Sequence, residues 1–188
     1  MLQITIPGRE CVIENPDGSV GFITVPETKL SLEHSLISVQ KWEAKWHTQF
    51  IDPSRQRTSE ESRDYIRCMV VKPNVENIDP NVFVFIPDNI MQKVINYIDD
   101  PMTGTTFSQH GNKAKPRPKK TSAEEIYWQM ITLGIPFECR TWHLNQLLTL
   151  IHVCDLKNQP PKKMSQSSWD KERRALNSAR RAKSGSRG

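Results

Sequence analysis

The sequence is 188 residues long, which is enough for one domain with appendages or at most two small domains. Only 36% of the residues are hydrophobic and 25% are charged, so the apolar content is low for a compact domain. No apolar run approaches the roughly 18 residues that a membrane span needs, and the N-terminus lacks the pattern of a secretion signal. We therefore expect a soluble, intracellular protein that is not exported.

The positive charge is concentrated at the C-terminal end. Residues 157–188 contain ten Lys and Arg against two acids, Asp170 and Glu172, which gives this stretch a net charge of +8. Because the whole chain carries +5, residues 1–156 carry −3. The pI of 9.1 is thus a property of the tail, and the body is nearly neutral.

Residues 1–27 have the pattern of a small β element. Leu2, Ile4 and Ile6 alternate with polar residues, and two further extended runs follow, Cys11 to Glu14 and Val20 to Val25. The residues between these two runs, 15–18, form an Asn-Pro-Asp-Gly turn signal, and Pro26 ends the third run. We predict a hairpin or a three-stranded sheet.

Residues 28–101 predict a helical region. Ser31 can cap a first helix. Thr58 and Glu61 have the spacing of a capping box for a second helix, and Asp88 can cap a third one that ends at residues 99–101. The apolar positions recur at helical spacing in all three: Leu32, Leu36, Val39, Trp42 and Trp46; Tyr65, Ile66 and Met69; Ile90, Val94, Ile95 and Ile98.

Residues 102–121 carry five basic residues, two prolines and no acid, and therefore predict a basic, flexible linker. A helical hairpin is expected over 122–161. Ser122 and Glu125 form a second capping box, and Gly134 and Pro136 end that helix. Its predicted inward positions are Ile126, Tyr127, Met130 and Ile131.

The next predicted helix, Glu138 to Leu156, is the most apolar in the chain. Its polar residues Asn145, Thr149 and His152 fall on one narrow strip. A helix that is apolar nearly all round is buried on most sides, either within the domain or in an oligomer. The prediction is an α+β fold, mainly helical.

The basic tail, 162–188, has the charge order of a helix over Ser165 to Lys183, with acids near its start and Arg and Lys at its end. Its large apolar residues are Trp169 and Leu176. Such a helix buries too little surface to be stable alone, so it should order on contact with a partner. Protein docking is favoured, while nucleic-acid binding through phosphates and a solubilising role stay open.

Sites for chemistry are weakly indicated. The sequence contains no phosphate-binding glycine loop, nucleophile elbow or paired-cysteine zinc motif. Cys139 and His143 are four residues apart on a predicted helix and are the best metal candidate, but core or interface packing is the better interpretation. Glu33-His34 is interpreted as a helix start and Asp99-Asp100 as a helix end. We expect no enzyme activity, no cofactor and no metal.

The four cysteines, Cys11, Cys68, Cys139 and Cys154, lie far apart among apolar neighbours and predict reduced thiols. Trp42 and Trp46, one turn apart, predict a core face, with base stacking as the alternative. The residues predicted to bind a partner come from the apolar helix and the tail: Trp142, Leu144, Leu147, Leu148, Ile151, Trp169, Leu176, Arg173, Arg174, Arg180 and Arg181.

Several segments together resemble a family of tail-morphogenesis proteins of long-tailed phages of Gram-positive bacteria, the tail assembly chaperones. The resemblance spans most of the chain and is weakest at residues 1–27 and 102–121. It is carried by residues 32–36 (LEHSL), 41–46 (KWEAKW), 65–69 (YIRCM), 135–145 (IPFECRTWHLN) and 173–183 (RRALNSARRAK).

The resemblance implies a helical chaperone that acts in the host cytoplasm, holds the tape measure protein in solution and helps tail tube subunits assemble around it. It also implies self-association and a C-terminal extension, here after Pro161, that contacts the tape measure protein. Two alternatives stay open: a structural virion component, such as a minor tail or head–tail connector protein, and a nucleic-acid-binding protein.

Overall fold

The computed structural model describes residues 1–14, 18–106, 120–158 and 166–184. Residues 15–17 of the predicted turn and most of the predicted linker at 102–121 lie outside these residues, whereas Gly18 has the positive φ, 81°, expected of it in the turn. The chain divides into two compact units, Met1–Asp155 and Leu156–Gly188. No helix of the described residues is long and apolar enough to cross a membrane.

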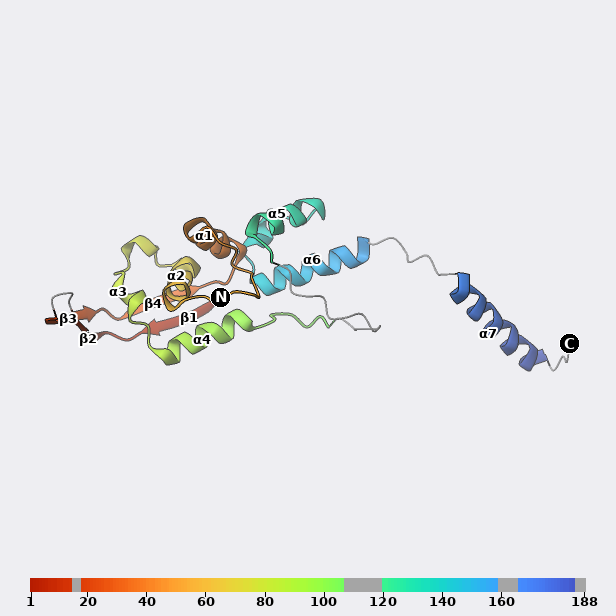
Figure 1. The fold of residues 1–188 in the computed structure, drawn as a ribbon, viewed down its shortest axis with the longest axis horizontal. Helices are drawn as coiled ribbons and strands as arrows, with labels where there is room; N and C mark the ends of the chain where they lie inside the picture. The colour runs from red at the N-terminus through yellow and green to blue at the C-terminus, as the bar shows by residue number, and fades with distance from the viewer. Residues whose placement is uncertain (15–17, 107–119, 159–165, 185–188) are drawn as a thin grey trace. The chain divides into compact units, whose positions relative to one another are not determined.

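The fold is α+β and mainly helical, as predicted (Figure 1). Most strands precede the helices in the chain. The strands are β1 (Leu2–Ile6), β2 (Arg9–Glu14), β3 (Val20–Val25), β4 (Thr28–Leu32) and β5 (Val70–Lys72). The helices are α1 (Leu36–Trp46), α2 (Ser59–Met69), α3 (Asn81–Val84), α4 (Asp88–Asp99), α5 (Ala123–Thr132), α6 (Leu144–Asn158) and α7 (Gln166–Ser184), with short 3-10 helices at Val75–Asn77 and Phe137–Thr141.

The strands form two separate antiparallel sheets. One has the order β1-β4-β5, with Ile4 opposite Leu30, and the other is the β2-β3 hairpin. The prediction that Ser31 caps a helix starting at Leu32 is therefore wrong, because both residues belong to β4. Alternation explains the difference: Leu30 and Leu32 are both buried, and the residues between and before them are polar.

Helix α1 begins one turn later than predicted, at Leu36, with Ser35 as its N-cap. Trp42 is completely buried and donates a hydrogen bond from Nε1 to the Glu61 carbonyl at 3.0 Å, so α1 is fixed on α2. Trp46 is half-buried and stacks on Trp42. The core interpretation of Trp42 is confirmed.

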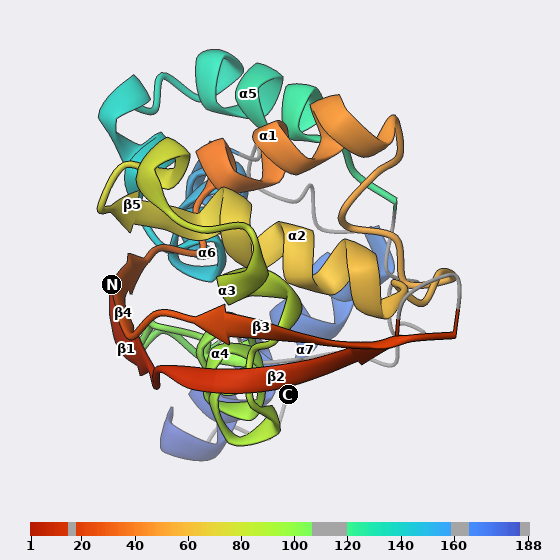
Figure 2. The same cartoon turned by 90° about the vertical axis from the view of Figure 1, so that its left-hand side faces the viewer.

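The two capping boxes are present as predicted, Thr58 with Glu61 and Ser122 with Glu125. The third expected cap is wrong. Pro87 occupies the N-cap of α4 and makes no side-chain capping bond, while Asp88 is the first helical residue. α4 lies alongside β1, on the opposite side of that strand from α1 (Figure 1). In Figure 2, α1 is near the top and α4 near the bottom.

Two residues expected in the core are exposed instead, Ile95 at 42% and Ile131 at 62%. Each lies at the margin of a helix face whose centre is buried, formed by Ile90 and Val94 in α4 and by Ile126 and Met130 in α5. On both helices, the face that is covered by the rest of the protein is narrower than the distribution of apolar residues predicts.

The second unit contains α7, whose bounds agree with the helix predicted for the tail. Leu176 is 54% exposed, and Arg173, Arg174, Arg180 and Arg181 are exposed as well. The side chain of Trp169 lies outside the described residues.

A peptide of residues 166–184 is expected to be mostly unfolded at 25 °C, because nineteen residues with few apolar side chains lie close to the limit for an isolated helix. Far-UV circular dichroism of the peptide tests this, with trifluoroethanol as the control for its capacity to form helix. A peptide more than half helical in plain buffer would contradict the expectation.

Candidate partner-binding groove

α5 is held against α1 by polar contacts at its start and middle. Ala123 donates its backbone N–H to Glu43 Oε2 at 2.8 Å, and the Tyr127 hydroxyl donates to Gln40 Oε1 at 3.1 Å. Ala123, Ile126 and Met130 are buried on the same side. The opposite side of α5 is left uncovered.

Glu43 connects three parts of the chain. Its carboxylate accepts the backbone N–H of Phe50 at 2.7 Å and that of Ala123 at 2.8 Å, and the side chain is 9% exposed. Burial raises the pKa of this carboxyl, and the two backbone donors act in the opposite direction. Glu43 therefore sets the position of α5 relative to α1.

The start of α6 is fixed by a different set of contacts. The predicted helix from Glu138 is wrong: residues 137–141 form a 3-10 helix, Trp142 is extended, and α6 begins at Leu144. His143 pairs with Ser35 as an isolated β-bridge, and Leu144 donates its N–H to the His34 carbonyl at 2.6 Å. These tertiary contacts prevent one continuous helix over this segment.

Cys139 and His143 consequently do not share a helix. The four cysteines are free thiols, and among the described residues no three potential ligands gather as a metal site would require. His143 Nε2 lies 2.9 Å from the carbonyl of Tyr97, which can only accept, so this nitrogen carries the proton.

Glu33 and His34 do not start a helix, contrary to the prediction, but take part in polar contacts with two tyrosines. His34 Nδ1 lies 2.5 Å from the Tyr65 hydroxyl, and the Tyr97 hydroxyl donates to Glu33 Oε1 at 2.7 Å. Burial, followed by the charges of His143 and Arg57, lowers the pKa of His34 to about 3. Since His34, Tyr65 and His143 are at most 5% exposed, a substrate has no access to them.

The far end of α4 also supports α6. Asn145 donates from Nδ2 to the carbonyls of Ile98 and Asp100, at 2.9 and 2.8 Å. The Thr149 hydroxyl donates to the Asn145 carbonyl within the helix. Two residues of the predicted polar strip, Asn145 and Thr149, are thus used in hydrogen bonds inside the protein.

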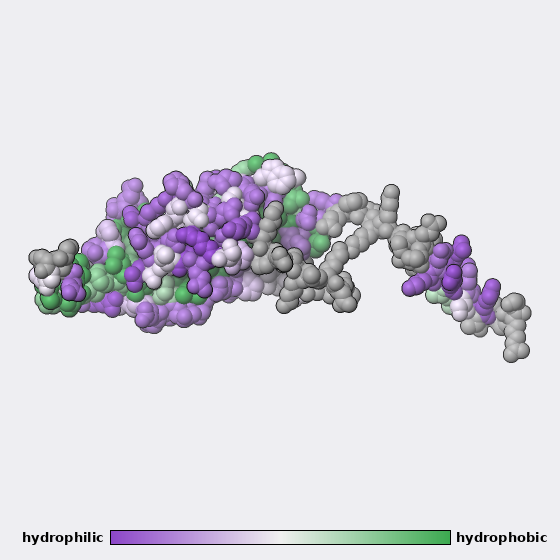
Figure 3. Space-filling model, viewed as in Figure 1, coloured by the Kyte–Doolittle hydropathy of each residue, from purple (hydrophilic) through white to green (hydrophobic). Residues whose placement is uncertain are grey.

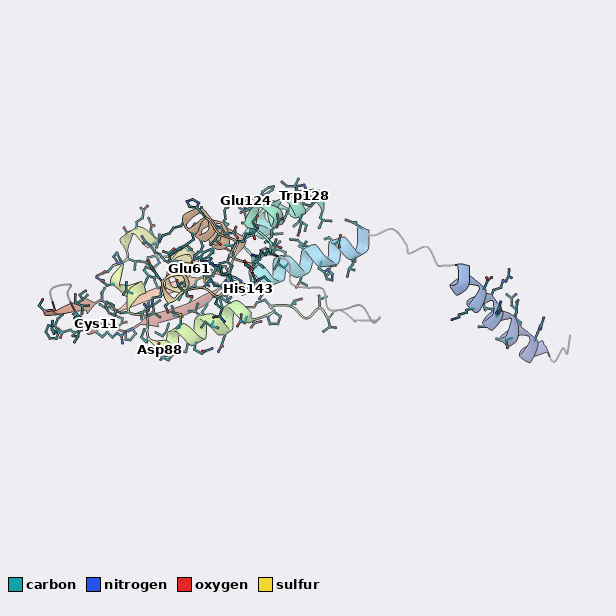
Figure 4. All side chains as sticks on the ribbon, in the orientation of Figure 1. Cys11, Glu61, Asp88, Glu124, Trp128 and His143 are labelled. Carbon is teal, nitrogen blue, oxygen red and sulfur yellow. The ribbon has the colours of Figure 1, made fainter. Side chains whose placement is uncertain are left out.

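A groove with a volume of about 470 Å³ lies between α5 and α6. Its lining is mainly apolar and comes from both helices: Trp128, Gln129, Thr132 and Leu133 from the α5 side, and Leu148, Ile151, His152 and Asp155 from α6. Trp128 is 65% exposed. Figure 3 shows hydrophobic residues at the surface of this region, and Figure 4 places Trp128 on α5 and His143 near the start of α6.

The α6 wall has the spacing i, i+3, i+4 and i+7, from Leu148 to Asp155, so it presents one continuous stripe about 10 Å long. Thr132 donates its hydroxyl to the Trp128 carbonyl at 2.9 Å. This internal bond satisfies the hydroxyl, so it needs no partner in the groove.

The groove includes only part of the predicted partner-binding set. Leu148 and Ile151 line it, whereas Leu144 and Leu147 are 2% and 0% exposed and pack inside the core. These two cannot contact a partner in this conformation, because they are the residues that attach α6 to the body. Trp142, 41% exposed, lies before α6 and does not line the groove.

The expectation that α6 is buried on most sides is wrong for the isolated chain. Only Leu144, Leu147 and Ile151 are buried, Leu148 and Leu150 are half-buried, and Leu156 is 46% exposed. Sequence reasoning missed Trp128. The available signal was that this tryptophan lies off the Ile126–Met130 stripe, on the side of α5 that the core does not use.

No family model, no curated protein and no solved structure matches this chain, so its function is inferred from the groove and from the sequence resemblance described above.

Proposed function

We propose that this protein is a non-enzymatic binding factor that holds an amphipathic helix of another protein in the α5–α6 groove. The observation that carries the proposal is the mainly apolar groove between two helices, with an exposed tryptophan at its margin. Grooves of this kind suit a helix that inserts residues at i, i+3, i+4 and i+7.

The proposed partner is the tape measure protein of a long-tailed phage, which makes this chain a tail assembly chaperone of the host cytoplasm. The sequence resemblance supports this identity. A tape measure protein is a long helical chain with apolar faces, and such a chain needs cover until tail tube subunits surround it. The exposed α7, with its arginines, is the proposed second contact.

Replacing Trp128 with glutamate is expected to abolish the solubilising effect on the tape measure protein. Trp128 is exposed, so its loss should leave the fold intact, while a charge in the groove must be desolvated when an apolar helix docks. The measurement is the soluble fraction of co-expressed tape measure protein. Ile95→Glu is the matched control, because Ile95 is an exposed apolar residue on α4 and does not line the groove.

Wild-type protein that leaves the solubility of the tape measure protein unchanged would overturn the chaperone proposal. Equal solubility with Trp128→Glu and wild type would remove the groove as the binding site. A chaperone should also be missing from purified virions, whereas a minor tail or connector protein stays in them, and mass spectrometry of particles separates these two.

A second candidate function is nucleic-acid binding by α7. Arg173 and Arg180, and likewise Arg174 and Arg181, are seven residues apart and exposed, so each pair lies on one side of the helix. Phosphate contacts of this kind predict DNA affinity that falls steeply with salt and is lost when residues 162–188 are removed.

A further inference from the structure

The β2-β3 hairpin is exposed along much of its length. Its base is attached to the body: Val25 is fully buried, and Arg9 Nη2 donates to the Phe85 carbonyl at 2.6 Å. Toward the turn the strands extend away from the helices, as Figure 1 shows at its left side. A two-stranded hairpin is at best marginally stable in water, whereas three or more strands with an apolar face are stable.

One face of the hairpin is open to solvent and carries three large apolar side chains among polar ones. The polar residues of this face are Glu10, Glu14 and Thr24. Val12 lies directly opposite Phe22 in the register, and Val20 follows on the same face. These three side chains are 63%, 72% and 64% exposed. Figure 3 shows hydrophobic residues at this end of the molecule.

The two edges of the hairpin differ in charge. Within the described chain, no strand pairs with the outer edge of β2 or of β3. β2 carries Arg9, Glu10 and Glu14, and charged side chains are the usual means by which edge strands avoid pairing with other chains. β3 has the sequence VGFITV, with no charge and no proline. Its edge is the unprotected one.

We propose that β3 is a self-association edge, at which two copies of this chain pair antiparallel about a two-fold axis centred on Phe22. The result is a continuous four-stranded sheet in the order β2-β3-β3-β2.

The register follows from the residues. Centring on Phe22 places Val20 opposite Thr24 of the second copy and Gly21 opposite Ile23, so no like charges meet. The same operation on β2, centred on Val12, would place Glu10 opposite Glu14 twice, which is destabilising. A second copy therefore fits the β3 edge and is disfavoured at the β2 edge.

The pairing also reduces the exposure of the apolar side chains on this face. Phe22 of one copy comes to lie beside Phe22 of the other, and the two Val12 side chains flank them, which gives one row of four apolar residues across the sheet. Cross-strand aromatic pairs of this kind stabilise antiparallel sheets. The contact is limited to one strand pair, so the dimer should form and dissociate with concentration.

Sedimentation equilibrium of the full chain tests the proposal, with masses between 21.7 kDa and twice that value expected as concentration rises. Phe22→Lys and Phe22→Glu should each weaken the dimer by about tenfold or more in dissociation constant, because like charges then face each other across the axis. An equimolar mixture of the two variants should restore association as a mixed dimer, since Lys then faces Glu.

Val12→Lys is the matched control. Val12 has nearly the exposure of Phe22 and lies on the same face of the hairpin. Because Val12 belongs to β2 and is not opposite the second copy, the Val12→Lys variant should still form the dimer. A wild-type chain that stays monomeric, a mixture that fails to associate, or equal loss with Val12→Lys and Phe22→Lys would each overturn the proposal.

Recovery of the mixed dimer also establishes that both Phe22 variants are folded. The proposal is independent of the helix-binding function, because Phe22→Lys leaves the α5–α6 groove unchanged. Solubilisation of the tape measure protein by this variant can therefore succeed or fail separately from dimer formation.

Discussion

Replacing Glu43 with alanine is expected to lower the free energy of unfolding by about 3–5 kcal/mol, because two buried backbone N–H groups lose a charged acceptor at once. The N–H groups of Phe50 and Ala123 would be left without the carboxylate that accepts them. Urea denaturation at pH 7 measures the loss.

Two further variants make the Glu43 prediction specific. Glu43→Gln is expected to have an intermediate effect, since the amide has one acceptor oxygen in place of two. Glu60→Ala, at an exposed position in the first turn of α2, should change the stability by less than about 1 kcal/mol. A loss below 1 kcal/mol for Glu43→Ala would mean that the carboxylate does not fix α5 on α1.

Lowering the pH from 7 to 5 is expected to destabilise the fold by about 2 kcal/mol through His34 alone. The pKa of this imidazole is lowered from 6.5 to about 3 in the folded state by burial, by His143 and by Arg57. The unfolded chain therefore binds a proton below about pH 6.5 that the folded chain excludes until about pH 3. The contribution of His34 to the free energy of unfolding is therefore fully present above about pH 6.5. It decreases as the pH falls from about 6.5 to about 3.

The measurement is the difference in free energy of unfolding between pH 7 and pH 5. His34→Gln should reduce this difference by about 2 kcal/mol, even if the variant is less stable at both pH values, because glutamine does not titrate. His152→Gln, at an exposed position, should retain the wild-type difference. The same pH dependence in wild type and His34→Gln would contradict the assignment.

Local signals in the sequence predicted the fold class and many of the helices. The capping boxes at Thr58 and Ser122 are short-range patterns, and both helices begin where these patterns place them. The errors came where long-range contacts decide. Leu32 fits a helical stripe with Leu36, but the pairing of β4 with β1 makes it a strand residue, and nothing local separates the two outcomes.

The candidate groove was only half predictable. The apolar residues of α6 are visible in the sequence, and two of the predicted partner-binding residues, Leu148 and Ile151, line the groove. Periodicity does not tell which side of an apolar helix meets the body, and the predicted partner-binding set therefore includes Leu144 and Leu147, which are buried in the core. The second wall, with Trp128, depends on how α5 packs on α1.

The bond between the Leu144 N–H and the His34 carbonyl joins the beginning and the end of the first unit, and this has a consequence for biosynthesis. A chain that leaves the ribosome N-terminus first can complete its early strands and helices, but the α6 wall cannot be attached until the residues of α6 have emerged. Docking capacity should therefore arise only after α6 has emerged from the ribosome. Ribosome-bound chains that stop before Leu144 should capture no partner helix.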